Sequence, residues 1–274
     1  MFTCIRPFPG ITHITDAMGV SFTLLEGRDR ALLFDAGYGL EDVSAYLRTL
    51  TDKPVDLFLS HGHHDHVLGA RWLPRGYMDP ADLEEFRLRT GVPQRERVMQ
   101  QAADKGLAVP EDYLRAPVPE PLPLSYADTL GVFPCRTFDL GGLEVLAVRV
   151  PGHTPGSIVL YVPSLQLLLT ADDWNPCTWM WFPCSLPVRT WHAAMTLLVG
   201  QLEGAFGGEI RHVLCSHQPA LRTGEELKAY LAYITEDRLL SAEKADMGAP
   251  VDTRRITCPE KGWMLVFDAE KKEK

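Results

Sequence analysis

Apolar and polar positions in the first part of the chain predict two strands, a helix and a third strand. The two strands are expected at Gly19–Leu25 and Arg30–Asp35, separated by the turn signal Glu-Gly-Arg-Asp. Apolar residues recur at helical spacing over Leu40–Leu50, and Val55–Leu59 has the composition of a short buried strand. This segment is therefore predicted to run in the order strand, strand, helix, strand.

The same rhythm returns in the second half of the chain. Strands are predicted at Leu143–Val150, Ser157–Val162, Leu165–Thr170, His212–Ser216 and Trp263–Phe267. Helices are predicted at Arg189–Leu202 and Gly224–Lys244. Strand runs with helices between them, in two halves, indicate two sheets covered by helices.

A polar segment interrupts this rhythm in the middle of the chain. Asp79–Gly106 is rich in Glu, Arg and Gln and has helical character, and Gly91 predicts a break into two helices. Ala116–Ser125 holds four prolines and is expected to be an irregular connector. We predict a single domain over residues 1–274 with a helical insertion, or lid, at about residues 76–128.

Composition and charge narrow the class of protein. The chain has 274 residues, of which 46% are hydrophobic and 23% charged, values that are ordinary for a soluble globular protein. The net charge of −9 argues against a nucleic-acid partner and leaves a small-molecule substrate as the expected one. Because the N-terminus lacks a signal-peptide layout and no run approaches the roughly 20 apolar residues of a membrane span, we expect a cytoplasmic protein without membrane association. The closing Ala-Glu-Lys-Lys-Glu-Lys is expected to be a frayed tail.

The segment Ser-His-Gly-His-His-Asp-His, directly after the strand that ends at Leu59, carries the candidate chemistry. Four imidazoles and a carboxylate within six positions are costly to bury without partners, and a metal ion supplies the partner. His61 and His63 are two positions apart and are expected to point the same way. Asp65 and His66 follow as the chain enters a helix, which turns them toward a second metal position, whereas the remaining His64 is expected to face outward.

The His-x-His-x-Asp-His pattern resembles the signature of the metallo-β-lactamase superfamily. Four further segments resemble other motifs of that family: Leu33–Gly37, Val150–Ser157, Leu169–Asp173 and Leu214–His217. The resemblance spans most of the chain, from roughly Gly19 to His217. It implies an α/β fold, the αββα sandwich, in which two mixed β-sheets are flanked by helices.

The resemblance also implies a ligand set. One metal site comprises His61, His63 and His153, and the other comprises Asp65, His66 and His217, with Asp172 bridging both. Asp35 is implied as a residue that supports the histidine loop without binding metal. The family usually has glycine before the bridging aspartate, where this chain has Ala171, and the neighbouring Asp173 leaves a second choice for the bridge.

Four aromatic residues follow this aspartate within ten positions. They are Trp174, Trp179, Trp181 and Phe182. Their clustering in a proline-containing loop suggests the apolar wall of a substrate pocket, with simple core packing as the alternative.

The resemblance implies two Zn²⁺ ions as cofactors, with iron or manganese as alternatives. We expect a dinuclear metal-dependent hydrolase that uses a metal-bridging hydroxide to cleave a small ester, thioester, lactone or β-lactam, with Asp65 orienting the nucleophile as a catalytic residue. The alternative is a mononuclear iron oxidoreductase, similar to persulfide dioxygenases, on the same fold. A non-catalytic binding protein is the third hypothesis, and the oligomeric state is not predicted.

Overall fold

The computed structural model describes residues 1–248 and 250–271, and these group into two compact units. Unit 1 comprises Met1–Ser125, Thr137–Val145 and Ser216–Ala220. Unit 2 comprises Tyr126–Arg136, Leu146–Cys215 and the described residues from Leu221 onward. The predicted extent of one domain over the whole chain stays a prediction.

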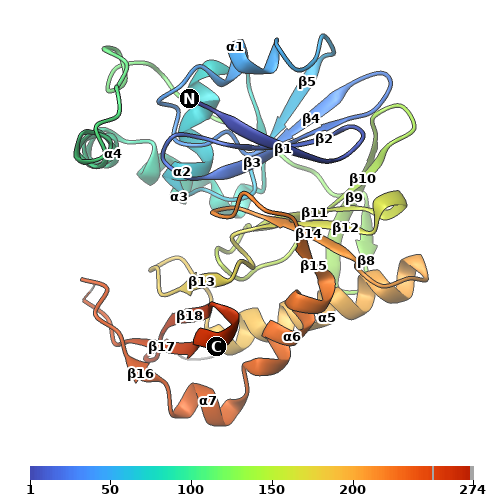
Figure 1. Ribbon diagram of the computed structural model, residues 1–274, viewed down its shortest axis with the longest axis vertical. Helices are drawn as coiled ribbons and strands as arrows, with labels where there is room; N and C mark the ends of the chain where they lie inside the picture. The colour runs from blue at the N-terminus through green and yellow to red at the C-terminus, as the bar shows by residue number, and fades with distance from the viewer. Residues whose placement is uncertain (249, 272–274) are drawn as a thin grey trace. The chain divides into compact units, whose positions relative to one another are not determined.

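A seven-stranded mixed sheet forms the frame of unit 1 (Figure 1). In spatial order its strands are β1 (Thr3–Phe8), β2 (Ile11–Thr15), β3 (Ser21–Glu26), β4 (Ala31–Phe34), β5 (Val55–Phe58), β6 (Tyr77–Met78) and β7 (Leu122–Pro123). Neighbours from β1 to β4 pair antiparallel, and those from β4 to β7 pair parallel. The predicted strands of this half are confirmed, whereas β1, β2, β6 and β7 were not predicted.

The helical elements of unit 1 are short. They are α1 (Val43–Leu47), α2 (His64–Val67), η1 (Leu68–Trp72), η2 (Pro80–Asp82), α3 (Leu83–Arg89) and α4 (Val92–Asp104). The polar segment forms separate helices, as predicted, and Gly91 is the N-cap of α4. Buried side chains of β3, β4, β5 and α1, among them Leu24, Leu33, Val43 and Leu57, make the core of this unit.

The insertion is fixed to the rest of unit 1 by buried contacts. Tyr113 is buried, and its hydroxyl donates a hydrogen bond to the carbonyl of Tyr38 at 2.7 Å. Arg95 on α4 donates to the carbonyls of Tyr113 and Ala116, which ties the proline-rich connector to the helix. Burying these groups with their partners satisfied holds the connector in one place.

A second seven-stranded mixed sheet lies mostly in unit 2, and only the end of β9 and the start of β10 are assigned to unit 1. Its strands in spatial order are β15 (Arg222–Thr223), β14 (His212–Cys215), β12 (Leu167–Ala171), β11 (Ile158–Val162), β10 (Glu144–Arg149), β9 (Phe133–Asp139) and β8 (Asp128–Leu130). The predicted hairpin between β11 and β12 turns at η3 (Pro163–Leu165), and β12 pairs parallel with β14. The long helix α5 (Val188–Phe206) and α6 (Gly224–Tyr233) contribute to the core of this unit.

A smaller sheet of four strands also belongs to unit 2. Its order is β13 (Cys177–Met180), β18 (Trp263–Asp268), β17 (Thr253–Cys258) and β16 (Glu243–Lys244), and β13 pairs parallel with β18. The prediction of one helix over Gly224–Lys244 is wrong. α6 ends at Tyr233 because Ile234 is extended, and the hydroxyl of Thr235 then caps a separate helix, α7 (Glu236–Leu240).

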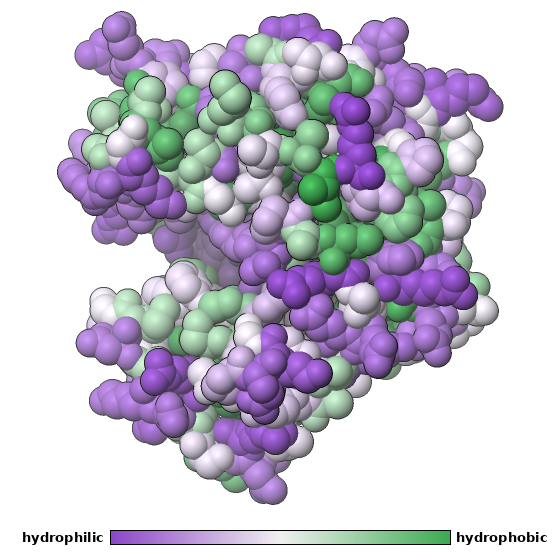
Figure 2. All heavy atoms as spheres, viewed as in Figure 1, coloured by the Kyte–Doolittle hydropathy of each residue, from purple (hydrophilic) through white to green (hydrophobic). Residues whose placement is uncertain are grey.

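Figure 2 shows that hydrophilic and hydrophobic residues are interspersed on one face of the described chain. Among residues 1–248 and 250–271, no helix has the length and apolar character needed to cross a membrane.

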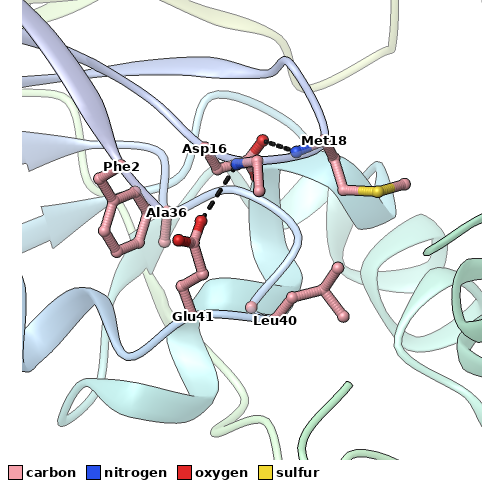
Figure 3. A pocket seen from close by; sticks show the side chains of 8 residues that line it. Phe2, Asp16, Met18, Ala36, Leu40 and Glu41 are labelled. Atoms are coloured by element: carbon pink, nitrogen blue, oxygen red, sulfur yellow. Dashed lines mark hydrogen bonds between the residues drawn. The ribbon is translucent and has the colours of Figure 1, made fainter. Parts of the chain in front are cut away.

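A cavity of about 10 Å³ in unit 1 is lined by Asp16, Met18 and Glu41 among others (Figure 3). The buried carboxylate of Asp16 accepts backbone hydrogen bonds from Met18, Gly19, Val20 and Tyr38, at 3.0 to 3.1 Å. Burial raises the pKa of Asp16, and these four donors act against that rise. A space of this size holds about one water molecule, so the cavity is part of a structural turn and too small for a substrate.

Candidate metal centre

The histidine-rich segment lies in unit 1, directly after β5, and runs into α2. As predicted, the chain becomes helical at this point: α2 begins at His64 and His63 is its N-cap. The ring of His61 lies 4.7 Å from that of His63 and 4.1 Å from that of His66, measured between centroids. The turn between the strand and the short helix therefore gathers these imidazoles at the carboxyl end of β5.

Asp35, at the end of β4, holds this segment from one side. Its carboxylate accepts hydrogen bonds from the backbone N–H and the hydroxyl of Ser60, both at 2.7 Å. The same carboxylate lies 2.8 Å from Nδ1 of His66. Asp35 is buried and has a φ of +69°, a backbone conformation that costs free energy in a residue other than glycine. Asp35 thus makes the contacts expected of a residue that orients the histidine loop.

The insertion holds the same segment from another side, through residues that the sequence did not single out. The buried Asp82, at the end of η2, accepts a hydrogen bond from the backbone N–H of Gly62 at 2.8 Å. A Cβ atom on Gly62 would lie 2.7 Å from the backbone nitrogen of Phe86, so only glycine fits beside α3. The insertion therefore begins with a support for the histidine loop.

Glu85 on α3 extends this support to His63. Its Oε1 atom lies 3.5 Å from Nε2 of His63 and accepts a hydrogen bond from Arg89 at 2.6 Å. Burial raises the pKa of Glu85, but the hydrogen bonds with His63 and Arg89 outweigh it and bring the pKa to about 2. Glu85 is therefore a carboxylate at neutral pH.

His217 follows β14 and belongs to unit 1 by its contacts. Its Nε2 atom lies 3.4 Å from Oδ2 of Asp65, and the same Asp65 oxygen lies 3.7 Å from Nε2 of His66. His13 donates a hydrogen bond to the carbonyl of Gln218 at 2.9 Å, which fixes the position of the residue next to His217. No role for His13 was predicted, because only the fold brings β2 beside this segment.

The prediction that His64 faces outward is wrong. Its side chain is only 19% exposed, and its ring packs edge-on against Tyr38 with centroids 5.4 Å apart. Burial lowers the pKa of His64 to about 4, against the raising effect of the adjacent Asp65. His64 therefore packs as a neutral side chain on the loop that follows β4.

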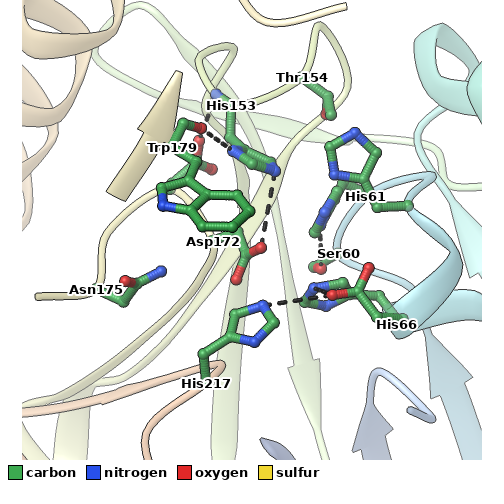
Figure 4. Close-up of polar contacts among 12 residues, drawn as sticks. Ser60, His61, His66, His153, Thr154, Asp172, Asn175, Trp179 and His217 are labelled. Atoms are coloured by element: carbon green, nitrogen blue, oxygen red, sulfur yellow. Dashed lines mark hydrogen bonds and ion pairs between the residues drawn. The ribbon is translucent and has the colours of Figure 1, made fainter. Parts of the chain in front are cut away.

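In unit 2, His153 and the two neighbouring aspartates have distinct contacts. Nε2 of His153 lies 3.7 Å from Oδ2 of Asp172, and its Nδ1 donates a hydrogen bond to the carbonyl of Trp179 at 2.8 Å (Figure 4). The backbone N–H of His153 donates to Asp173 at 3.0 Å. Asp172 thus faces the imidazole edge that carries Nε2, whereas Asp173 holds the backbone of the loop.

The aromatic residues after Asp172 divide into two groups. Trp174 is fully buried in the core of unit 2, 6.0 Å from the ring of Tyr230, so its assignment to a pocket wall is wrong. By contrast, Trp179 is 38% exposed and Phe182 is only partly buried. Trp181 stacks on Phe182, with centroids 4.5 Å apart, and the Phe182 ring lies 5.5 Å from that of His153. Three rings, Trp179, Trp181 and Phe182, therefore form a cluster beside His153, which we call the ring cluster.

The donor chemistry of these residues fits divalent metal ions. Because the hydroxyl of Ser60 gives its one proton to Asp35, Nδ1–H of His61 donates to that hydroxyl, at 2.8 Å. His66 and His153 likewise use Nδ1, toward Asp35 and the Trp179 carbonyl. In all three the tautomer places a lone pair on Nε2, as in metal-binding histidines whose other nitrogen is hydrogen-bonded. His63 differs, because its Nε2 faces Glu85 and Nδ1 would be its ligating atom.

Comparison with known proteins shows which protein family the chain matches. The profile of the metallo-beta-lactamase superfamily matches residues 15–172, more than half of the chain. No curated protein sequence matches the chain at a significant level. The match ends at Asp172, so His217 lies beyond it.

Solved structures similar to this chain include a metallo-beta-lactamase from Pontibacter korlensis, with 15% identity, a TM-score of 0.53 and coverage of 85% of this chain and 98% of that one. The sec-alkylsulfatase Pisa1 from Pseudomonas sp. has 16% identity and a TM-score of 0.62, over 88% of this chain and 43% of that one. TTHA1623 in a di-iron-bound form has 23% identity and a TM-score of 0.52, over 78% of this chain and 94% of that one.

These structural likenesses concern the fold alone, and with the family match they confirm the predicted metallo-β-lactamase fold class, αββα with mixed sheets and flanking helices. The family match and the His/Asp donors agree, and the chain belongs to the metallo-beta-lactamase superfamily.

Proposed function

We propose that this protein is a dinuclear metal-dependent hydrolase. The observation that carries the proposal is the cluster in unit 1, where the ligand atoms of Asp65, His66 and His217 lie within 4.8 Å of one another. Membership of a superfamily that consists mostly of metal-dependent hydrolases supports it. We assign one metal to His61, His63 and His153, the other to Asp65, His66 and His217, and the bridging position to Asp172.

When bound, two divalent ions lower the pKa of a water molecule and polarise the substrate oxygen, which is the chemistry of hydrolysis. The residues of this chain set the geometry for it. Asp65 has one carboxylate oxygen near Nε2 of both His66 and His217, so the three side chains direct their donor atoms at one position, and we assign Asp65 the further role of orienting the nucleophile. Asp35 and Ser60 keep the imidazoles in the ligating tautomer throughout.

The ring cluster supports a substrate that carries an apolar group. Its three rings offer apolar surface next to His153, whereas the chain as a whole is acidic. We assign it a small ester, thioester, lactone or β-lactam with an apolar group that contacts these rings. Zn²⁺ is the proposed metal, and the di-iron form of TTHA1623 makes iron the first alternative to examine.

The test is metal quantification followed by a substrate panel. We expect about two metal ions per chain, and no more than about one in His61→Ala or Asp172→Ala, because each substitution removes a proposed ligand. His212→Ala, a histidine of β14 outside the proposed ligand set, is the matched control and should keep both ions. The panel comprises thioester, lactone, β-lactam, phosphodiester and sulfate-ester substrates.

Other outcomes point to other functions. One iron per chain with oxygen consumption would identify a mononuclear iron oxidoreductase. A chain that binds no divalent metal, or in which His61→Ala leaves function unchanged, would be a non-catalytic binding protein.

A further inference from the structure

The last described residues of the chain lie beside the loop that carries the ring cluster. β13 and β18 pair in parallel, from Cys177 opposite Met264 to Met180 opposite Phe267. Parallel strands end at the same edge of a sheet, so the residues that follow β13 and those that follow β18 leave the sheet together. This topology brings residues 269–271, expected from the sequence to be frayed, next to residues 181–184 in unit 2.

Lys271 makes a specific contact at this edge. Its ammonium group donates hydrogen bonds to the carbonyls of Phe182 and Pro183, at 2.8 and 3.1 Å. The lysine is partly buried, and Pro183 has no N–H group with which its loop could pair in a strand ladder. An ammonium that bonds two consecutive carbonyls fixes the direction of the backbone between them, and hydrogen bonds from a charged donor are stronger than neutral ones.

The backbone held in this way determines two features next to His153. The carbonyl of Trp179 accepts the Nδ1–H of His153 and so sets the ring orientation and the tautomer. The Phe182 ring packs edge-on against the imidazole, and Trp181 stacks on the Phe182 ring. A shift of this loop would therefore move the imidazole and the apolar surface together.

We propose that Lys271 is a positioning residue that locks the Trp179–Phe182 segment, and through it the His153 imidazole and the ring cluster that contacts the apolar group of the substrate. Lys271 touches neither substrate nor metal and acts through the backbone of Phe182 and Pro183. The part that concerns metal and substrate rests on the proposed function. The part that concerns the loop does not depend on it.

Three variants test the proposal in the full chain. Lys271→Met removes the ammonium and keeps an apolar stem, Lys271→Arg restores a charged donor, and Lys261→Met removes an exposed lysine of η4 (Pro259–Lys261) elsewhere in unit 2. Fluorine NMR of metal-free protein containing 5-fluorotryptophan reports the loop directly, with resonances assigned by Trp179→Phe and Trp181→Phe.

We expect Lys271→Met to shift or broaden the Trp179 and Trp181 resonances and to leave that of the buried Trp191 in place. Zn²⁺ affinity, measured by chelator competition, should fall about 10-fold, as is usual when a group that orients a metal ligand is lost. For a hydrolysed substrate, KM should rise several-fold with little change in kcat. Lys271→Arg should restore the tryptophan resonances, the Zn²⁺ affinity and KM toward those of the wild type. Lys261→Met should match the wild type in all of them.

The outcomes separate this inference from the proposed function. If wild-type protein binds no Zn²⁺, the proposed function fails, and the tryptophan resonances alone decide whether Lys271 locks the loop. Wild-type-like resonances in a folded Lys271→Met protein would overturn the inference. A Lys271→Arg protein that behaves like Lys271→Met would also overturn the inference.

Discussion

The two units hold their metal-binding donors by different means. In unit 1, side chains support the histidine loop: Asp35 binds Ser60 and His66, and Asp82 binds the backbone of Gly62. In unit 2, a backbone carbonyl supports the imidazole of His153, and the carboxylate of Asp173 accepts a hydrogen bond from its backbone N–H.

This difference determines how each part responds to substitution. A side-chain support is lost when one residue changes, so the histidine loop of unit 1 should be sensitive at Asp35. A carbonyl support survives any change of its own side chain, so His153 should depend on the path of the backbone around it. Unit 2 has residues other than glycine at positive φ at Gln166 and at Ala171, which is next to the proposed bridging residue, whereas unit 1 has them at Asp35 and His217.

Asp35→Ala should have the largest effect. The substitution leaves the Ser60 N–H, the Ser60 hydroxyl and Nδ1 of His66 without their acceptor in a buried place, and it puts alanine at a φ of +69°. We expect the free energy of unfolding of the metal-free protein to fall by about 4 kcal/mol, because three buried donors lose their acceptor and each such loss costs about 1–3 kcal/mol. Urea unfolding measures it.

Asp35→Asn is the matched control for that loss. Asparagine tolerates a positive φ and keeps one oxygen acceptor, so we expect a fall of about 2 kcal/mol. Metal affinity should decrease in both variants, and more in Asp35→Ala. Equal stability of Asp35→Ala and the wild type would show that the histidine loop is held by something other than this carboxylate.

Substitution of the two aspartates at the end of β12 should distinguish a structural residue, Asp173, from a metal-binding residue, Asp172. Asp173→Ala leaves the buried N–H of His153 without its acceptor, so the metal-free protein should lose about 2 kcal/mol of stability. Asp172→Ala should leave that stability within about 0.5 kcal/mol of the wild type and abolish binding of the second metal ion. Thermal unfolding of metal-free protein and metal titration measure the two effects. The reverse pattern would assign the bridge to Asp173.

Trp179→Ala tests the carbonyl support in unit 2. The substitution removes an exposed ring but keeps the backbone carbonyl that accepts Nδ1–H of His153, so Zn²⁺ affinity should stay within about threefold of the wild type. KM for a hydrolysed substrate should rise about 5-fold, since an aromatic contact of this kind contributes about 1 kcal/mol. A loss of metal affinity as large as that of Asp35→Ala would remove the distinction between the two units.

Much of the candidate centre was predictable because its residues follow strands. The ends of β5, β12 and β14 can be identified from apolar runs, and His61, Asp172 and His217 each follow one of them within about three residues. The supports Asp82, Glu85 and His13 were not predictable in this way. Glu85 contacts the donor His63, and Asp82 and His13 contact residues next to donors, from segments whose sequence carries no metal-binding motif.

Two differences between sequence and structure have local physical reasons. Clustering of aromatic residues after Asp172 does not distinguish core rings from exposed ones: Trp174 lies in the core, whereas Trp179 is exposed on a strand whose neighbouring residues are buried. Apolar spacing alone predicts one helix over Gly224–Lys244, but it does not register the capping hydroxyl of Thr235, which begins a separate helix.

Ala171→Gly should have the smallest effect and the opposite sign. Ala171 has a φ of +47°, and the register between β12 and β14 shifts at this residue, which lies directly before Asp172. Glycine adopts this conformation without the steric cost that Cβ imposes, so the metal-free protein should gain about 1 kcal/mol, less the small loss from removing a buried methyl group. Ala147→Gly, in the buried middle of β10 with an ordinary φ, is the matched control and should destabilise the protein by about 1 kcal/mol. If both substitutions destabilise equally, the backbone at Ala171 is unstrained, and the absence of the glycine usual in the family carries no energetic cost here.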